Sequence, residues 1–506
     1  MSDHKIRNIV IVGGGTAGWM AAAAMVRLLD RSTNITLVES DEIGTVGVGE
    51  ATIPPIIAYN KMLGINEDEF LAATKATFKL GIEFIGWGAP GERYFHPFGC
   101  HGQDFRGVHF HQLYLRELKQ RPLDDIACWS MSAVAAGLGR FARPAPDAPL
   151  PLSQLAYAFH FDAGLYAQYL RRLAEKQGVR RVEGKIVDAE LDSSTGHVQS
   201  VQLTDGTVLS GELFIDCSGF RGLLIEEKLR AGYDSWLHWL PCDRAMAVPT
   251  DYSGQPDPFT RSTARSAGWQ WRIPLQHRMG NGLVYSSAYQ DDADAEAGLL
   301  ANLEGQALAE PRRLSFTAGR RRLAWDANVV SLGLSSGFVE PLESTSVHLI
   351  QSGIVKLLAL FPDKRFNPVE RDEYNRQMSD VYEDARDFII LHYKATRRDD
   401  SEFWNYCRTM DVPESLGRKL ELWRSKGRLF RESYELFGTA SWVAVLLGQG
   451  VVPDEHEPAA DGVDPKLFAD ALDKMKLSYR AMAEHMPEHG DFVADVCKRA
   501  AAGAQP

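Results

Sequence analysis

The sequence is poor in cysteine, and its cysteines do not form a metal-binding or disulfide pattern. The chain of 506 residues has six, which are scattered, with no Cys-x-x-Cys pair and no histidine at metal-ligand spacing. Thiols in this arrangement are typical of a reducing compartment, so we expect neither a disulfide framework nor a metal site. The six are Cys100, Cys128, Cys217, Cys242, Cys407 and Cys497.

Long apolar runs and an excess of basic charge are also absent. The apolar run Ile9–Val12 ends at glycines after four residues, whereas a membrane span needs about 18. The net charge of −12 argues against nucleic acid or an anionic membrane as a partner, because both attract basic surfaces. With 45 % hydrophobic and 24 % charged residues, the composition is that of a soluble globular protein, which we expect to be cytoplasmic.

A glycine motif follows the first apolar run. The segment Gly13-Gly14-Gly15-Thr16-Ala17-Gly18 stands between a predicted strand, Asn8–Val12, and an Ala-rich helix that begins at Trp19. Glu39 ends the second predicted strand, 24 residues after Gly15. Such glycines let a pyrophosphate approach the helix N-terminus, and the acid binds a ribose hydroxyl. The predicted dinucleotide-binding residues here are Gly13, Gly15, Thr16, Ala17, Gly18 and Glu39.

The rest of the chain distinguishes FAD from NAD. Small-residue segments recur at Gly47–Thr52, after the strand that ends at Asp216, and at Gly333–Gly337. This arrangement resembles the glutathione-reductase-like FAD-binding fold of aromatic hydroxylases. The fold class is therefore predicted as α/β, with an additional mostly helical C-terminal region. No second G-x-G-x-x-G follows a strand, so reduced flavin is expected from a separate NAD(P)H-dependent flavin reductase.

The apolar periodicity predicts two regions along the chain. Residues 1–365 form the FAD-binding core, with inserted substrate-side loops at about 85–150 and a β-meander over 182–203. Residues 366–506 form a helical substrate-side region packed on this core. Helices are predicted over 162–177 and 346–360, and 78–84 alternates as one strand.

Three further motifs point to a specific chemistry. They are Phe78-Lys79-Leu80-Gly81-Ile82, Trp269-Gln270-Trp271-Arg272-Ile273-Pro274 and Glu340-Pro341-Leu342-Glu343-Ser344-Thr345. With them the sequence resembles the flavin-dependent tryptophan halogenases over nearly its whole length, from Gly13 through 157–163 to 437–442. The Trp-x-Trp-x-Ile-Pro pattern is specific to that family.

The resemblance implies a reaction sequence. FADH2 and O2 oxidise a halide ion, chloride or bromide, to hypohalous acid, which travels through the protein to Lys79. There the lysine either forms a haloamine or donates a hydrogen bond that polarises the hypohalous acid. Glu343, with Ser344 beside it, stabilises the cationic intermediate of the aromatic substrate and accepts its proton.

Several other residues have both a functional and a purely structural interpretation. The amides of Thr345 and Ser346, at the start of a predicted helix, suit a halide, but Ser344–Ser346 also reads as a plain N-cap. By resemblance Trp269 and Trp271 wall the flavin side, although tryptophans two apart on a strand are usually core. His96 and Phe98 match residues that sandwich indole, although such a histidine is often structural. Further FAD contacts are expected at Gly49, Ala51, Val187, Leu334 and Val347.

The sequence departs from the family in two places. The segment Phe430–Leu436 has no adjacent tyrosines to hold an amino-acid head group, and unpaired charges of a buried zwitterion are costly. Indole or an indole-bearing compound is therefore favoured over free tryptophan. Ser346 replaces a frequent glycine, and we expect bromide to be used at least as well as chloride. An aromatic monooxygenase and a non-catalytic flavin-binding protein are the alternatives, and the oligomeric state, homodimer included, is open.

Overall fold

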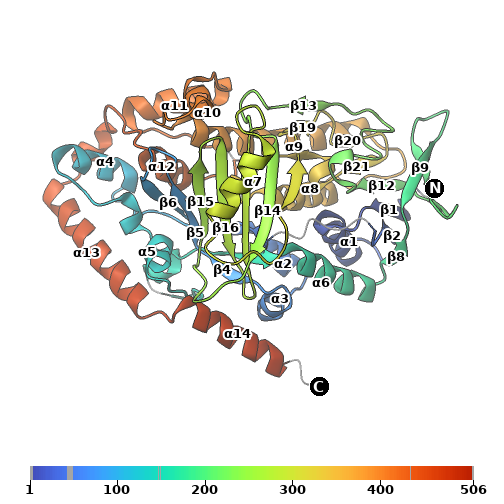
Figure 1. The fold of residues 1–506 in the computed structure, drawn as a ribbon, viewed down its shortest axis with the longest axis horizontal. Coiled ribbons are helices and arrows are strands. Elements are labelled where there is room, and N and C mark those ends of the chain that lie inside the picture. The colour runs from blue at the N-terminus through green and yellow to red at the C-terminus, as the bar shows by residue number, and fades with distance from the viewer. Residues whose placement is uncertain (1–3, 43–48, 146, 149, 433–434, 504–506) are drawn as a thin grey trace. The chain divides into compact units, whose positions relative to one another are not determined.

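The computed structural model describes residues 4–42, 49–145, 147–148, 150–432 and 435–503 (Figure 1). The chain forms two compact units, each assembled from three separate stretches. The first unit comprises Met1–Lys75, Phe161–His238 and Phe316–Glu383, and the second comprises Ala76–His160, Trp239–Ser315 and Asp384–Pro506. The division expected near residue 365 therefore coincides with no boundary between these units.

The first unit is built on a six-stranded sheet in the order β20-β21-β12-β1-β2-β8. Its strands are β1 (Asn8–Val12), β2 (Asn34–Glu39), β8 (Arg180–Glu183), β12 (Leu213–Asp216), β20 (Trp325–Asp326) and β21 (Val329–Ser331). All neighbours are parallel except β20 and β21. The predicted β-turn-α-β start is confirmed, because helix α1 (Thr16–Leu28) connects the parallel strands β1 and β2.

The predicted β-meander consists of β9 (Ile186–Leu191), β10 (Val198–Leu203) and β11 (Val208–Ser210). Val10 and Val12 of β1 share one buried cluster with Ile186 and Val201 of the meander. Because side chains alternate along a strand, the intervening residues of β1 point to the other face of the sheet. Helix α1 contacts helices α6 (Ala163–Lys176) and α8 (Ser346–Ala359). Both predicted helices, over 162–177 and 346–360, are thus confirmed.

Shorter elements complete the first unit. They are β3 (Gly49–Ala51), α2 (Pro55–Met62), α3 (Glu67–Ala73), η3 (Gly219–Arg221), β13 (Tyr233–Ser235), β19 (Gly319–Arg321), η4 (Gly333–Ser335), β22 (Gly337–Phe338) and η5 (Pro341–Glu343). Strands β13, β19 and β22 form a small antiparallel sheet. Helix α9 (Pro368–Lys394) begins in the first unit and ends in the second.

The second unit contains a seven-stranded sheet in the order β18-β14-β17-β16-β15-β5-β6. Its strands are β5 (Gly81–Ile85), β6 (Arg93–Pro97), β14 (Arg244–Thr250), β15 (Thr260–Arg265), β16 (Gly268–Pro274), β17 (Met279–Tyr285) and β18 (Arg312–Ser315). Beside it, β4 (Thr77–Lys79) pairs antiparallel with the first residues of β7 (Ala158–Asp162).

The single strand predicted over 78–84 is wrong. The chain breaks at Leu80, whose amide donates to the carbonyl of Pro258 over 2.7 Å, and β4 and β5 join different sheets. Gly81 allows the close approach of β6 after the break, because a Cβ there would lie 2.4 Å from the carbonyl oxygen of His96. Lys79 is therefore the last residue of β4, and the chain leaves this strand directly after it.

The stretch 85–150, predicted as loops, also contains regular structure. It forms β6, α4 (Phe110–Gln120), η1 (Ile126–Trp129) and α5 (Met131–Gly137). The buried residues of helix α4 include polar ones. Among them, Arg116 donates to the carbonyl oxygens of Ala460 and Val463 over 2.5 and 2.6 Å. These two partners lie 344 and 347 positions further along the chain.

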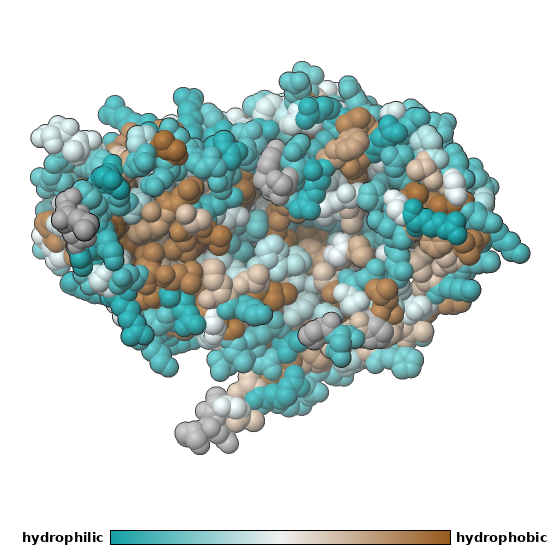
Figure 2. Space-filling model, turned by 180° about the vertical axis from the view of Figure 1, so that it is seen from behind, coloured by the Kyte–Doolittle hydropathy of each residue, from teal (hydrophilic) through white to brown (hydrophobic). Residues whose placement is uncertain are grey.

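The remaining elements of the second unit are helices, and those after residue 365 confirm the predicted helical C-terminal region. They are η2 (Leu152–Gln154), α7 (Asp292–Ala301), α10 (Glu402–Thr409), α11 (Glu414–Lys426), α12 (Thr439–Gly448), η6 (Pro458–Gly462), α13 (Pro465–Glu484) and α14 (His489–Gly503). Within the described ranges, no helix has the length and apolar character that a bilayer crossing requires. On the face drawn in Figure 2, hydrophilic and hydrophobic residues form a mixture of patches.

Candidate active site

Three of the four glycines in the segment Gly13–Gly18 show why glycine is needed where β1 turns into α1. Gly13 has φ +104°, and a Cβ there would lie 2.3 Å from the carbonyl oxygen of Cys217. At Gly18 a Cβ would lie 1.9 Å from the carbonyl oxygen of Gly13. At Gly15 a Cβ would meet nothing within 4 Å among the described atoms. The first and third glycines thus close the turn, while the second leaves open space at the first turn of α1, as a pyrophosphate requires.

The N-terminus of α1 also suits a phosphate electrostatically. Gly15 is the N-cap, and no side chain of the described part of the chain caps it. The first amides of a helix lack intrahelical partners and carry the positive end of the helix dipole. Thr16 and Ala17 contribute to this first turn. The residues present therefore fit the pyrophosphate of a dinucleotide.

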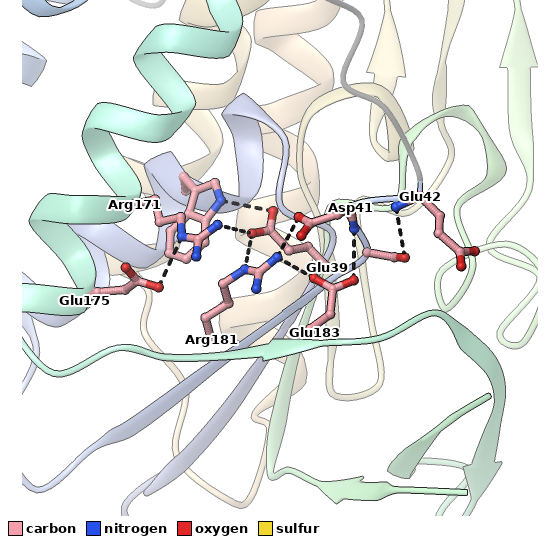
Figure 3. A network of polar contacts seen from close by, with 9 residues as sticks. Glu39, Asp41, Glu42, Arg171, Glu175, Arg181 and Glu183 are labelled. Carbon is pink, nitrogen blue, oxygen red and sulfur yellow. Dashed lines mark hydrogen bonds and ion pairs between the residues drawn. The ribbon is translucent and has the colours of Figure 1, made fainter. Parts of the chain in front are cut away.

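Glu39, at the end of β2, is held over the glycine loop by a polar network (Figure 3). Its Oε2 accepts from the indole nitrogen of Trp19 over 3.2 Å. Its Oε1 accepts from Arg181 over 2.6 Å and from Arg171 over 3.5 Å. A Cβ on Gly14 would lie 1.6 Å from Oε2, so glycine at this position leaves room for the carboxylate. Sequence reasoning found Glu39 but not Trp19, Arg171 and Arg181, which orient it.

A second loop packs against the start of α1. Gly333, with φ +68°, precedes Leu334 in η4, and a Cβ on Gly333 would lie 2.8 Å from the Cβ of Ala17. Val347 is buried in the first turn of α8, which also contacts α1. The first unit thus brings Ala17, Leu334 and Val347 to neighbouring elements.

Three expected FAD contacts lie on other strands of the first unit. Gly49 and Ala51 form β3, whereas Gly47 and Val48 of the same motif lie outside the described residues. Val187 lies on β9 of the meander, with 53 % of its surface exposed.

The segment from Glu343 to Ser346 turns from η5 into α8. Glu343 is fully buried, and Ser344 has φ +61°, a left-handed conformation that costs a residue with a side chain about 1–3 kcal/mol. Thr345 is the N-cap and Ser346 the first residue of α8, as predicted. The hydroxyl of Thr345 is buried and has no hydrogen-bond partner within the described residues. A buried hydroxyl beside helix N-terminal amides is a set of donors that fits a halide ion.

In the second unit, Lys79 ends β4 and is fully buried. Its Nζ lies 5.1 Å from the centroid of the Phe98 ring. Phe98 is tied to the lysine segment because its amide donates to the carbonyl of Leu80 over 2.9 Å. His96, on β6, packs its ring at 5.8 Å from that of Phe388. The structure therefore brings Lys79 and Phe98 together and places His96 against a different aromatic ring.

A hydrogen-bonded chain that sequence reasoning missed supports the lysine strand. The hydroxyl of Thr77 donates to the carbonyl of Pro274 over 2.7 Å and contacts His160 Nδ1 at 3.0 Å. Since the hydroxyl has one hydrogen, Nδ1 must donate to it, and Nε2 accepts from Thr260 over 3.0 Å. Burial, then the charge of Lys79, holds the pKa of His160 well below its usual range.

This chain connects two of the sequence motifs. Pro274 ends the Trp-x-Trp-x-Ile-Pro segment, and Thr77 precedes Lys79 by two residues on the same strand. Side chains two apart on a strand share one face. The two-residue spacing from Lys79 could have identified Thr77 from the sequence. The pairing of Thr77 with His160 is visible only in the register of the sheet.

Trp269 and Trp271 lie on β16, with ring centroids 6.1 Å apart. The ring of Trp269 lies 6.4 Å from that of Trp87 and is almost completely buried. The ring of Trp271 lies across Gly282, where a Cβ would lie 2.0 Å from it. Both rings pack in the interior of the second unit, and a role toward the flavin is a separate proposal.

The sequence and the fold are similar to those of known proteins. The sequence profile of the tryptophan halogenases matches residues 8–465. The chain belongs to the tryptophan halogenase family. Among curated relatives, the tryptophan 6-halogenase of Streptomyces toxytricini is 34 % identical over 528 residues, which cover 99 % of this chain and all of the relative.

Two solved structures of flavin-dependent halogenases are more similar in sequence to this chain than the curated relative is. A flavin-dependent halogenase from Brevundimonas sp. BAL3 is 48 % identical, with a TM-score of 0.94, covering 98 % of this chain and 100 % of the other. One from Xanthomonas campestris is 47 % identical, also with a TM-score of 0.94, covering 97 % and 99 %. The predicted glutathione-reductase-like FAD-binding fold with a helical C-terminal region is confirmed, and the family implies FAD as cofactor.

Proposed function

We propose that this halogenase uses FADH2, O2 and a halide ion to halogenate an electron-rich aromatic compound, either indole or an indole-bearing molecule. The observation that carries the proposal is Lys79, a fully buried lysine with its Nζ 5.1 Å from the Phe98 ring. Away from water, a lysine side chain donates hydrogen bonds to a reactant without competition from solvent. When bound, the reduced flavin would supply two of the four electrons that reduce O2, and the halide would supply the other two as it is oxidised to hypohalous acid.

Flavin binding is assigned to the first unit. The glycine loop, Glu39, β3 and the starts of η4 and α8 hold the cofactor, with Val187 as a further contact. The open space at Gly15 and the uncapped first turn of α1 support this assignment within the described residues. A separate NAD(P)H-dependent reductase delivers the reduced flavin, because the sequence has a single G-x-G-x-x-G after a strand.

Lys79 directs the halogen. We favour hydrogen-bond donation from its ammonium to the oxygen of hypohalous acid over formation of a haloamine, because the contact with Phe98 stabilises the charged form. A donor on that oxygen makes hydroxide a better leaving group and the halogen more electrophilic. Phe98 and His96 flank the aromatic substrate in this assignment.

Glu343 accepts the proton that the halogenated ring loses. Glu343 is fully buried, and a carboxylate shielded from water stabilises a positively charged intermediate strongly. The buried hydroxyl of Thr345 and the amides of Thr345 and Ser346 bind the halide, and the strained turn at Ser344 separates the halide-binding residues from Glu343. Trp269 and Trp271 keep the aromatic substrate from the flavin.

The substrate proposal is supported by the segment around Glu435. Glu435 is 5 % exposed and already forms an ion pair with Lys419. The buried carboxylate of this segment is therefore neutralised by the protein's own cation and is not available to an amino acid's ammonium group. The solved structures at 48 % and 47 % identity are named only flavin-dependent halogenases, whereas the relative named for tryptophan is 34 % identical.

The test is mass spectrometry of products from indole and from tryptophan, with FAD, NADH, a flavin reductase and bromide. We expect bromoindole and no bromotryptophan. A product heavier by one oxygen atom would support an aromatic monooxygenase instead, as would a Lys79→Ala variant that still modifies the substrate. Turnover with bromide should equal or exceed that with chloride at matched concentrations, and the reverse order would contradict the proposed role of Ser346.

A further inference from the structure

The strand that carries Lys79 has an edge closed by a histidine from the other end of the chain. The amide of Phe78 donates to Nε2 of His489, in α14, over 3.0 Å, across 411 positions of sequence. On the opposite side of the same ring, Nδ1 lies 2.7 Å from the carbonyl oxygen of Pro256. His489 is 1 % exposed. An imidazole therefore bridges two backbone segments in the interior of the second unit.

The hydrogen bonds define which nitrogen carries the proton. An amide can only donate, so Nε2 must accept, and Nδ1 must then hold the hydrogen that Pro256 accepts. The ring is neutral with one tautomer. Burial lowers the pKa of His489 to about 4, which agrees with a neutral ring.

The bridge lies next to a direct hydrogen bond between the same segments. Leu80 donates to Pro258 over 2.7 Å, while Phe78 reaches Pro256 through the ring. The segments 78–80 and 256–258 are thus joined at two points, two residues apart. Lys79 stands between these points, so its backbone position is set on both sides.

Helix α14 is itself fixed where His489 begins it. The amide of His489 donates to the carbonyl of Gly139 over 2.9 Å. The ring of Phe78 stacks on Phe141 at 4.0 Å and meets Phe492 of α14 at 5.5 Å. The histidine is therefore held by its own backbone and by packing around Phe78.

We infer that His489 is a positioning residue for Lys79, which couples helix α14 to halogen transfer. The inference rests on the proposed function of Lys79. Removal of the bridge leaves the amide of Phe78 without its acceptor and lets the lysine segment shift. A misplacement of about 1 Å in a reacting group lowers turnover by about 100-fold.

Two substitutions separate the two hydrogen bonds of the ring. His489→Gln can place an acceptor near the position of Nε2, whereas His489→Asn can place a donor near the position of Nδ1. We expect His489→Gln to halogenate indole within about 3-fold of wild type, and His489→Asn and His489→Ala to lose about 10- to 100-fold in kcat. KM for indole, the Kd for FAD and the rate of flavin reoxidation by O2 should stay within about 2-fold in all three variants.

A second readout does not need turnover. Hydrogen–deuterium exchange of the peptide that spans 76–80 should accelerate in His489→Asn and His489→Ala and stay slow in His489→Gln. The matched control is His485→Ala, because His485, the residue after α13, is exposed and contacts the carbonyl of Ala481 in the last turn of that helix. This control should match wild type in both measurements.

The outcomes divide clearly. Wild-type turnover by His489→Ala, or equal losses in His489→Gln and His489→Asn, would overturn the inference. Equal exchange of 76–80 in every variant would overturn it as well. If wild type yields no halogenated product while exchange follows the expected order, the proposed function fails and the positioning of the lysine segment by His489 stands.

Discussion

Acid should destabilise the fold partly through His111, and the size of this effect follows from its surroundings. His111 lies in α4, and its Nε2 donates to the carbonyl of Gly427 over 3.0 Å. Burial lowers its pKa to about 4, from an ordinary value of 6.5. The unfolded chain therefore binds more protons than the native protein between pH 6.5 and 4. The histidine's contribution to stability is full above pH 6.5 and is lost as pH falls through 4.

The linkage relation gives the magnitude. With pKa values of about 4 in the native and 6.5 in the unfolded state, lowering the pH from 7 to 5 removes about 2 kcal/mol from the free energy of unfolding. Other groups act in the opposite direction, because burial raises the pKa of Glu50 and of Asp384 to about 7. The histidine must therefore be isolated by comparison with a variant.

His111→Gln is the appropriate variant, because an amide keeps the donor to Gly427 but does not titrate. Urea unfolding followed by tryptophan fluorescence at pH 7 and pH 5 gives the free energy of unfolding at each pH. We expect wild type to lose about 2 kcal/mol more than His111→Gln over this interval. His485→Gln, at an exposed histidine, should behave as wild type. An equal loss in wild type and His111→Gln would refute the reasoning.

Three further predictions concern the first unit. Gly15→Ala should weaken FAD binding, measured by FAD titration, with little change in melting temperature, because a Cβ at Gly15 meets no described atom within 4 Å. Gly18→Ala should lower the melting temperature in thermal unfolding, because a Cβ at Gly18 would collide with the backbone of Gly13. Thr345→Val should raise KM for bromide by about 10-fold through loss of a hydrogen bond to an anion, measured by halide titration. Arg181→Met should raise the Kd for FAD but not for FMN, which lacks the adenosine ribose, because Glu39 loses its 2.6 Å partner.

The parts of the fold that sequence predicted are those whose signals are local. The strand, turn and helix around Gly13–Gly18 follow from apolar alternation and glycine placement over a short stretch, and the start of α8 follows from Ser344–Ser346. In each case the residues that decide the conformation are neighbours in sequence. Family resemblance then supplied roles for Lys79 and Glu343 that no spacing could give.

The parts that sequence missed depend on distant partners. The break at Leu80 follows from Pro258 and from the approach of β6 to Gly81, and neither is visible in the alternation over 78–84. The burial of Arg116 in α4 depends on carbonyl partners far along the chain, which local sequence does not reveal. The sequence around His489 does not predict its role, because that role depends on the amide of Phe78, which lies 411 residues away.

The contact between Phe78 and His489 also constrains how the protein is made. The lysine strand emerges from the ribosome early, but the imidazole that closes its edge is 411 residues behind it. At a synthesis rate of about 5–20 residues per second, this delay is about 20–80 s. During that time the amide of Phe78 lacks its native acceptor, so this strand can mispair in the nascent chain. Lowering the growth temperature or raising the supply of chaperones during expression should therefore increase the yield of active enzyme more than the stability of the folded protein would suggest.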